Sequence, residues 1–333
     1  MFGPTSRISR GRAFQGAAAV LVLLGLLLWW LLPIGTSSPS GSVTFSTGVT
    51  SGVYQRYGTL LKQDLARDLP DVSIQLRTSE GSQQNIARVA AGEADFTIAT
   101  ADAVAKYQKD GKPGADRLRG CARLYDDYVQ LVVAKGSGIR STSDLRGRKV
   151  GVGQEGSGVR LIADRLLSAA DLDPRKDIVP FSVGIDTMPG LLERRELDAF
   201  FWSGGLPTGA VQDLSERFDI RLVPLESTLV DRLHASGEAA SRYYRSAVIP
   251  ADAYGKAQNG TAVPTVAVAN LLVTTDRMSA GLTEGFTRTV IDSRDRIGDE
   301  VHPAQLVDLR TAIYTDPLPL HEGAKRYYRS EKP

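Results

Sequence analysis

Residues 43–53, VTFSTGVTSGV, and residues 149–159, KVGVGQEGSGV, decide the fold of this chain. Each stretch has the pattern of an apolar strand, a loop of small residues and the start of an amphipathic helix. The order strand, helix, strand, helix, strand runs over residues 43–99 and again over residues 149–202. Two such units aim their Gly/Ser loops and helix N-termini outward from the carboxyl ends of the strands. We therefore expect two similar α/β lobes facing a ligand across a cleft, an arrangement that captures a small molecule without a catalytic residue.

The composition is that of a globular protein without a strongly charged surface. The 333 residues are 42% hydrophobic, which is enough for two domains with cores of their own. The formal charge is +2, but Arg7, Arg10 and Arg12 are the only charged residues before residue 42, so the remainder carries −1. A nearly neutral domain offers no surface that tracks phosphates, and nucleic acid is therefore not an expected partner.

The residue inventory gives little support to metal or redox chemistry. Cys121 is the only cysteine, which excludes an intramolecular disulfide and favours a small buried residue over a reactive thiol. The three histidines lie far apart without HxxxH or HExxH spacing, so no metal site is predicted. The chain also lacks a G-x-S-x-G elbow and a GxxxxGK[ST] loop, and we expect neither an enzyme nor a cofactor.

The N-terminus carries the pattern of an export signal. Three arginines precede an uncharged apolar run over residues 13–32, which ends in Trp29-Trp30-Leu31-Leu32. The run approaches the length that crosses a bilayer, and paired tryptophans suit the membrane interface. No cysteine follows for lipid attachment and no clear A-x-A site is visible, which favours an uncleaved signal anchor over a cleaved signal peptide. Residues 35–41 then form a tether and residues 42–333 are extracytoplasmic, held at the cell membrane or, after cleavage, secreted.

The chain is expected to cross between the two lobes twice. An apolar strand at residues 128–134 leads into the hinge Gly136-Ser137-Gly138, and a second β-like run at residues 263–274 returns. The first lobe is then discontinuous, as in a clamshell that closes on its guest. The predicted parts are residues 1–41 as signal and tether, residues 42–131 with 263–333 as lobe I, residues 132–225 as lobe II, and residues 226–262 as a connecting segment of open assignment.

The loop Gly151–Gly156 satisfies G-x-G-x-x-G between a strand and a helix, the pattern of a dinucleotide-binding turn. The acid expected about twenty residues later falls in the loop before the second strand, and Glu155 puts a negative charge inside the turn. A nicotinamide-dependent oxidoreductase therefore stays a remote alternative. Two simpler interpretations remain open: Ser157, Gly158 and the N–H groups of this helix start hold a carboxylate or similar anion, or the turn is tight and binds nothing.

Two further groups near the predicted cleft each allow two interpretations. Asp126 and Asp127 are adjacent, so in a strand their side chains point to opposite faces. Tyr125 and Tyr128 beside them either line the cleft or cap the edge of the sheet. Trp202 ends a strand at the predicted mouth, where it either packs or recognises a ligand, and the glycines after it allow close approach to a guest.

Together, these residues resemble the TAXI-type extracytoplasmic solute-binding subunits of TRAP transporters. The resemblance is carried by six stretches in order, STGVTSGVYQRYG (46–58), SEGSQQNIARVAAGEADFTIATAD (79–102), SGIRSTSDLRGRKVGVGQEGSG (137–158), ELDAFFWSGGLPTGA (196–210), VPTVAVANLLV (263–273) and PLPLHEGAKRYYR (317–329). It implies an α/β fold of the two-lobe type II periplasmic-binding-protein class, with a hinge and a central ligand cleft. It also implies capture of a small carboxylate, a glutamate-like amino acid or a dicarboxylate, for a permease driven by an ion gradient.

The resemblance further implies ligand contacts from loops of both lobes. The candidate ligand-binding residues are Thr47, Gly48, Tyr54, Ser82, Asn85, Gly156, Ser157, Gly158, Trp202 and Gly204. The chain departs from the family pattern where Val159 replaces a common threonine and Ala101 a common serine, which leaves the ligand's identity open. Arg160 either compensates as a bidentate carboxylate partner or is a solvated helix arginine.

The leading hypothesis is therefore a non-enzymatic receptor, tethered to the membrane by its N-terminal helix, that captures a small organic anion or amino acid for a TRAP-type permease. The second hypothesis is a ligand-sensing binding protein that passes its closed state to a membrane signalling receptor. Permease genes beside the gene for this chain would favour the first hypothesis, and kinase genes the second.

Overall fold

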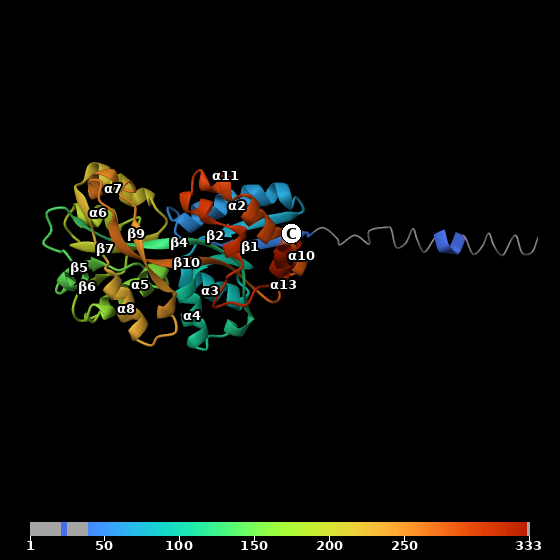
Figure 1. The fold of residues 1–333 in the computed structure, drawn as a ribbon, viewed down its shortest axis with the longest axis horizontal. Coiled ribbons are helices and arrows are strands. Elements are labelled where there is room, and N and C mark those ends of the chain that lie inside the picture. The colour runs from blue at the N-terminus through green and yellow to red at the C-terminus, as the bar shows by residue number, and fades with distance from the viewer. Residues whose placement is uncertain (1–20, 25–38, 332–333) are drawn as a thin grey trace, which may run out of the picture. The chain divides into compact units, whose positions relative to one another are not determined.

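The structure, a computed structural model, describes residues 21–24 and 39–331 (Figure 1). Residues 21–24 are helical, and the rest of the expected signal anchor lies outside the described residues. In the part that is described, no helix is both long and apolar enough to span a bilayer. Residues 1–38 and 39–333 are separate units, and every named strand belongs to the second.

Within residues 39–331, ten strands form one continuous sheet that serves both lobes. Its order is β2, β1, β3, β10, β4, β7, β5, β6, with β8 beside β4 and β9 beside β10. The strands are β1 (Gly41–Ser46), β2 (Val72–Arg77), β3 (Phe96–Thr100), β4 (Leu118–Ala134), β5 (Lys149–Gly151), β6 (Val179–Phe181), β7 (Ala199–Gly204), β8 (Ile220–Val223), β9 (Tyr244–Ile249) and β10 (Val263–Thr275). The pairs within each repeated unit are parallel, β1 with β2 and β3, and β5 with β6 and β7. The two repeated stretches of sequence thus form the two outer parts of the sheet.

Two long strands, β4 and β10, run from one lobe into the other. β4 pairs with β10 from Leu118 to Tyr128, and its second half pairs with β7 and β8 up to Ala134. β10 pairs with β9 at its start and with β3 from Asn270 to Val273. β4 begins ten residues before the strand expected at residue 128. The sequence conceals this extension because charged residues interrupt the apolar run, while the pairing with β10 continues along β4 with two register shifts.

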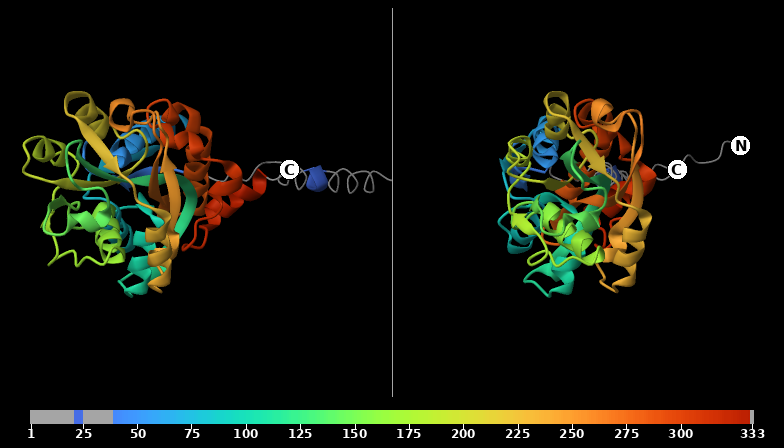
Figure 2. Two further views of the ribbon diagram at one scale, coloured as in Figure 1. Left: turned by 60° about the vertical axis from the view of Figure 1, so that its left-hand side comes forward. Right: turned by 90° about the vertical axis from the view of Figure 1, so that its left-hand side faces the viewer.

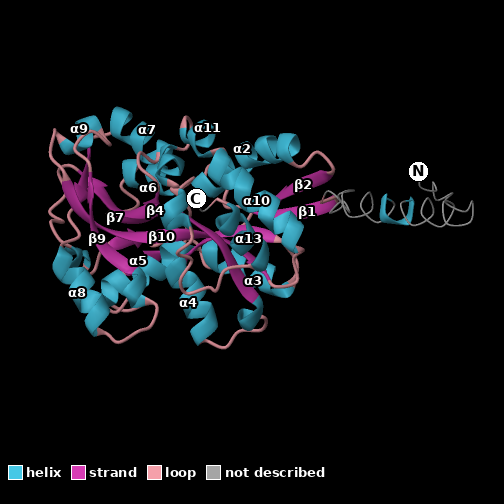
Figure 3. Ribbon diagram, turned by 45° about the vertical axis from the view of Figure 1, so that its right-hand side comes forward, coloured by secondary structure: helices cyan, strands magenta, loops and turns pink. Residues whose placement is uncertain are grey.

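Helices cover both faces of the sheet in each lobe (Figures 2 and 3). In the first lobe one face carries α2 (Val53–Asp68), α10 (Ala280–Asp292), α11 (Arg294–Gly298), α12 (Leu309–Ala312) and α13 (Glu322–Ser330), and the other α3 (Ser82–Ala91) and α4 (Ala101–Lys109). In the second lobe one face carries α5 (Gly158–Ala169) and α8 (Ser227–Ala235), and the other α6 (Met188–Glu193), α7 (Gly209–Arg217) and α9 (Gly255–Gln258). Each lobe therefore has an apolar core on both sides of its strands, as the parallel strands in its outer part require.

The cores show where the chain passes between the lobes. Val129 already packs with the second lobe, and in β10 Val268 belongs to the second lobe while Leu271 and Leu272 belong to the first. The passages thus lie near residue 128 and near residue 270, a few residues from the boundaries expected at 131 and 263. Residues 226–262 pack into the second lobe, because α8, β9 and α9 place apolar side chains in its two cores.

Candidate functional site

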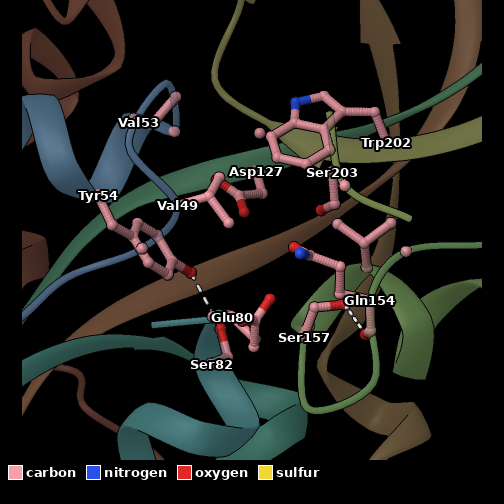
Figure 4. A pocket seen from close by; sticks show the side chains of 18 of the residues that line it. Val49, Val53, Tyr54, Glu80, Ser82, Asp127, Gln154, Ser157, Trp202 and Ser203 are labelled. Carbon is pink, nitrogen blue, oxygen red and sulfur yellow. Dashed lines mark hydrogen bonds between the residues drawn. The ribbon is translucent and has the colours of Figure 1, made fainter. Parts of the chain in front are cut away.

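A cavity lies between the two lobes where the loops of both meet (Figure 4). It holds about 600 Å³ of empty space including its mouth, of which about 60 Å³ is open to the centre of a water molecule. Because one water needs about 10–15 Å³ by that measure, the cavity has room for about five waters or one small organic molecule. Its wall is formed by Gly48, Val49, Gly52, Val53, Tyr54, Glu80, Gly81, Ser82, Thr100, Asp127, Gly153, Gln154, Ser157, Gly158, Val159, Gly184, Trp202, Ser203 and Gly204.

The first lobe contributes the N-termini of α2 and α3 to this wall. α2 begins directly after Gly52, which has an extended backbone, and this places Tyr54 in its first turn. The Tyr54 hydroxyl donates to Oδ1 of Asn270 in β10 and lies 3.1 Å from Oγ of Ser82 at the start of α3. Burial raises the pKa of Tyr54 well above 10, so the hydroxyl stays protonated. One phenol group thus joins two helix N-termini to a crossing strand.

The second lobe contributes the N-terminus of α5. Ser157 caps this helix, since its Oγ accepts the N–H of Arg160 at 3.0 Å and donates to the carbonyl of Gln154 at 2.7 Å. Gly153 and Gly156 have φ values of +87° and +83°, which non-glycine residues rarely adopt. A Cβ on Gly153 would also lie only 2.8 Å from the backbone nitrogen of Arg160. The tight turn by itself accounts for Gly153 and Gly156, two of the three glycines of the G-x-G-x-x-G pattern.

The end of β7 completes the wall with an aromatic ring. Trp202 packs against both cores of the second lobe, lines the cavity and donates from Nε1 to Oγ1 of Thr208 at 3.2 Å. Gly204 makes room for the ring, because a Cβ there would lie 2.7 Å from Nε1 of Trp202. The tryptophan therefore packs in the second lobe and also lies on the wall, and its recognition of a ligand stays a prediction.

Three helix N-termini lie at the cavity, and each has backbone N–H groups that lack a hydrogen-bond acceptor in the described part of the chain. The first N–H groups of a helix have no intrahelical acceptor, and the partial positive charge of the helix end favours an anion. At the starts of α2, α3 and α5 the wall carries such N–H groups without an acceptor in residues 39–331, those of Val53, Tyr54, Ser82, Gly158 and Val159. The cavity is thus equipped to hold a carboxylate from both lobes.

Two carboxyl groups also lie on the wall, whereas no lysine, arginine or histidine is among its residues, all of which the structure describes. Asp127 in β4 is 4% exposed and accepts at Oδ1 from Nδ2 of Asn270 at 2.7 Å. Burial raises its pKa from 3.8 to about 7 although the Asn270 donor lowers it. Glu80 Oε2, Thr100 Oγ1 and Ser203 Oγ are buried without a hydrogen-bond partner in the described chain. The wall therefore presents several polar atoms that lack protein partners.

The structure brings most, but not all, of the predicted residues to this wall. Those that line it are Gly48, Tyr54, Ser82, Ser157, Gly158, Trp202 and Gly204. Thr47 and Asn85 lie behind it, where Nδ2 of Asn85 donates to the carbonyls of Thr47 at 2.8 Å and Ile98 at 3.0 Å. They hold the loop after β1 in place. Gly156 lies in the contact between the lobes, where its carbonyl accepts the N–H of Gln84 at 3.1 Å.

Arg160 does not line the cavity, and its guanidinium has protein partners. Its Nε donates to both oxygens of Asp164 at 2.9 and 3.0 Å, and its second nitrogen reaches Glu155 at 2.5 Å and Ser182 at 2.9 Å. Arg160 therefore does not lie where it could bind a carboxylate of the ligand, which is one of the two roles that the sequence allows. The Gly-Ser-Gly helix start is the part of this segment that faces the cavity.

Sequence analysis indicates that Asp126 and Asp127 point to opposite faces but does not say which of them faces the cleft. It does not identify Glu80, Gln154 or the unpaired hydroxyls of the wall as site residues. Asp126 pairs with Arg123 and Arg245, and the next carboxyl group therefore points to the cavity. Tyr125 does neither of the things expected of it, because its ring is buried in the first lobe against Tyr57.

The two lobes touch around the cavity. Nε2 of Gln83 donates to the carbonyl of Ser157 at 2.7 Å across the cleft. Farther from the mouth, the buried carboxylate of Asp102 in α4 accepts from the Tyr244 hydroxyl at 2.6 Å and from Arg165 at 3.2 Å, both in the second lobe. The structure is therefore a closed arrangement of the clamshell, with the cavity shielded by contacts on several sides.

Known proteins resemble this chain in fold and sequence pattern. A provisionally assigned L-cystine ABC transporter from Listeria monocytogenes matches 80% of this chain and 98% of its own at 13% identity, with a TM-score of 0.51. The periplasmic aliphatic sulphonate binding protein SsuA from Escherichia coli matches 89% of this chain and 84% of its own at 15% identity, with a TM-score of 0.49. The first match supports the two-lobe α/β fold of periplasmic binding proteins and confirms that prediction. The model of the NMT1-like family matches residues 45–331, and the chain belongs to this family.

Proposed function

We propose that this chain is an extracytoplasmic solute-binding protein that encloses a small organic molecule between its lobes and delivers it to a membrane importer. The observation that carries the proposal is the cavity itself, because helix N-termini from both lobes meet there with unused donors. A ligand held by both lobes stabilises the closed arrangement, which an importer can distinguish from the open one. The family and the fold of the structural neighbours support the same function.

The residues of the wall fit a site that binds a ligand without catalysing a reaction on it. Histidine, cysteine and lysine, which serve as base or nucleophile in many enzymes, are absent from the nineteen residues of the wall, all of them described, and we assign its two carboxyl groups, Asp127 and Glu80, to ligand contacts. The glycines at Gly153 and Gly156 are required by their own turn, so the loop gives no separate support to a dinucleotide site. We therefore propose a receptor that has no reaction of its own.

The importer that fits the sequence resemblance is a TRAP-type permease, with a carboxylate held at the helix N-termini. An ABC importer is the second candidate, because the structural neighbour from Listeria is described as an ABC transporter. A sensor that signals to a membrane receptor is the third. The genes beside this one separate the three, since they would encode a permease, an ATPase or a kinase. In each case we propose that the apolar run over residues 13–32 tethers the protein to the membrane.

Thermal-shift and fluorescence titrations of the full chain test the proposed function. Glutamate, glutamine, 2-oxoglutarate, succinate and a set of neutral amino acids serve as probes, and a ligand at a hundred times its Kd adds about 2.7 kcal/mol of stability. Trp202 is the one tryptophan in residues 39–331 and lies on the wall, so binding should change its emission. Trp202→Phe should lose that response, whereas Tyr314→Phe, at an exposed side chain, should keep it. Absence of any stabilisation and of any co-purified small molecule would contradict the proposal.

A further inference from the structure

The charged groups on the wall of the cavity have one sign. Asp127 and Glu80 are the two charged residues of the wall, and both are acids. They come from different elements, Asp127 from the crossing strand β4 and Glu80 from the loop before α3, and face one space (Figure 4). A dicarboxylate would bring two further negative charges beside them without a cation on the wall to balance the four; Arg88, which interacts with the charge of Glu80, does not line the cavity and donates to Ser46 and Thr78. The wall is thus poorly matched to a dianion.

The unpartnered atoms on the wall call for a donor from the ligand. Oε2 of Glu80 is buried without a hydrogen bond in residues 39–331, and the same holds for the hydroxyl oxygens of Thr100 and Ser203. Thr100 is 1% and Ser203 is 7% exposed, so water reaches neither freely. A protonated amine supplies three donors and one positive charge, which suits two carboxylates and neighbouring hydroxyls. These atoms therefore indicate an ammonium group.

The helix N-termini and the apolar side chains define the rest of the ligand. The free N–H groups at the starts of α2, α3 and α5 suit one carboxylate. Val49, Val53, Val159 and the Trp202 ring form the apolar part of the wall, and they offer nothing to a second carboxylate. The volume limits the ligand to a molecule of roughly amino-acid size.

We infer that the ligand is a small neutral zwitterion, with a protonated amine bound by Asp127 and Glu80, a carboxylate at the helix N-termini, and an apolar or uncharged remainder. The inference rests on the proposed binding function and narrows it. It selects neutral amino acids over the glutamate-like and dicarboxylate ligands that the sequence resemblance implies. Asp127 is then the residue that discriminates between an amine and its deaminated analogue.

Isothermal titration of the full chain with matched probes tests the inference. L-Alanine, L-serine, L-valine, L-leucine and L-proline are the neutral zwitterions, and L-glutamine against L-glutamate isolates the effect of a second carboxylate. 3-Methylbutanoate and isobutylamine are valine without its amine and without its carboxylate. The neutral amino acid that binds best should bind at least about tenfold more tightly than its deaminated analogue, as a hydrogen bond between charged groups requires. Glutamine should bind more tightly than glutamate.

Two variants and one control assign the amine to its site. Asp127→Asn keeps the shape of the side chain and should remove at least about tenfold of the affinity for the amino acid, with little change for 3-methylbutanoate. Glu80→Gln should act in the same direction, and it serves if the first variant fails to fold. Asp126→Asn is the matched control, because this neighbouring carboxylate pairs with Arg123 and Arg245 and does not line the cavity. Its preference for the amine should stay as in the wild type.

Mass spectrometry of the denatured protein identifies a co-purified compound before any titration. A compound with an amine and one carboxylate supports the inference. Succinate, glutarate or glutamate binding as tightly as the neutral amino acids, or equal affinity for deaminated analogues, overturns it while the binding function stands. No binding of any probe and no co-purified compound would overturn both.

Discussion

The substitution Asp127→Asn should make the ligand-free protein more stable, because it replaces a buried carboxyl group by an uncharged amide of nearly the same volume. The carboxyl group lies in the cleft, 4% exposed, with Asn270 as its hydrogen-bond donor. Burial disfavours its charged form, and the charges of Asp126 and Asp102 add to that effect. Tyr54 and Tyr125 face it as neutral phenols, because burial raises the pKa of each well above 10.

The magnitude follows from the two pKa values of the group. The pKa is raised from 3.8 to about 7 on folding, so between these values the folded state binds more protons than the unfolded state. The stability contributed by the protonated carboxyl group is therefore lost as the pH rises through this window. An uncharged side chain of the same shape avoids a cost of about 2 kcal/mol at pH 5 and about 4 kcal/mol at pH 8. The melting temperature at pH 8 should rise by roughly 8 °C.

Chemical denaturation at pH 5, 6.5 and 8 measures the difference in the free energy of unfolding between the variant and the wild type. The protein is first freed of ligand by extensive dialysis. Asp126→Asn is the control with the opposite sign, since it removes a carboxylate that pairs with Arg123 and Arg245 and should lower the stability at each pH. Addition of the best neutral amino acid should stabilise the wild type more than Asp127→Asn. A variant that is no more stable than the wild type at pH 8, or a gap that does not change with pH, would refute the burial of a charged carboxylate at this position.

Three further substitutions probe the frame of the cleft. Tyr244→Phe removes the hydroxyl that donates to Asp102 across the lobes at 2.6 Å, and urea titration should show a loss of about 1–3 kcal/mol. Gly81→Ala should weaken ligand binding in calorimetry, because its φ of +126° on the wall of the cavity strains any residue with a side chain by about 1–3 kcal/mol. Arg160→Ala should change the ligand affinity by less than about twofold, since the partners of Arg160 lie outside the cavity. A loss of affinity of about tenfold would mean that Arg160 contacts the ligand.

The repeated units could be predicted from sequence because their signals are local. A strand, a turn and a helix start lie within eleven residues at 43–53 and again at 149–159. Cap residues, turn glycines and apolar spacing act over such distances without help from the rest of the chain. The structure accordingly forms β1 and α2, and β5 and α5, at these places, and Tyr54, Ser157 and their neighbouring glycines line the cavity.

The acid wall could not be predicted in the same way, because it depends on pairing between distant parts of the chain. Asp127 receives its hydrogen bond from Asn270, 143 residues away, and this contact exists only where β4 lies beside β10. The charged residues of β4 interrupt its apolar pattern, so the sequence predicts the strand only from residue 128 onward. Arg160 shows the converse case: the sequence leaves it as either a carboxylate partner or a solvated helix arginine, and only the fold shows that it pairs with Asp164 and Glu155.

The unpaired atoms of the wall and the bonds between the lobes set the balance of the clamshell. Each buried polar group without a partner costs about 1–3 kcal/mol, and a net hydrogen bond returns only about 1 kcal/mol. In the closed arrangement Glu80, Thr100 and Ser203 carry such costs, while the side chain of Gln83 and the Asp102–Tyr244 pair bridge the lobes. The opposing terms are of similar size, so the empty protein can open at little net cost in free energy. A ligand that satisfies the same atoms shifts this balance by its full differential affinity, which makes closure report that the cavity is occupied.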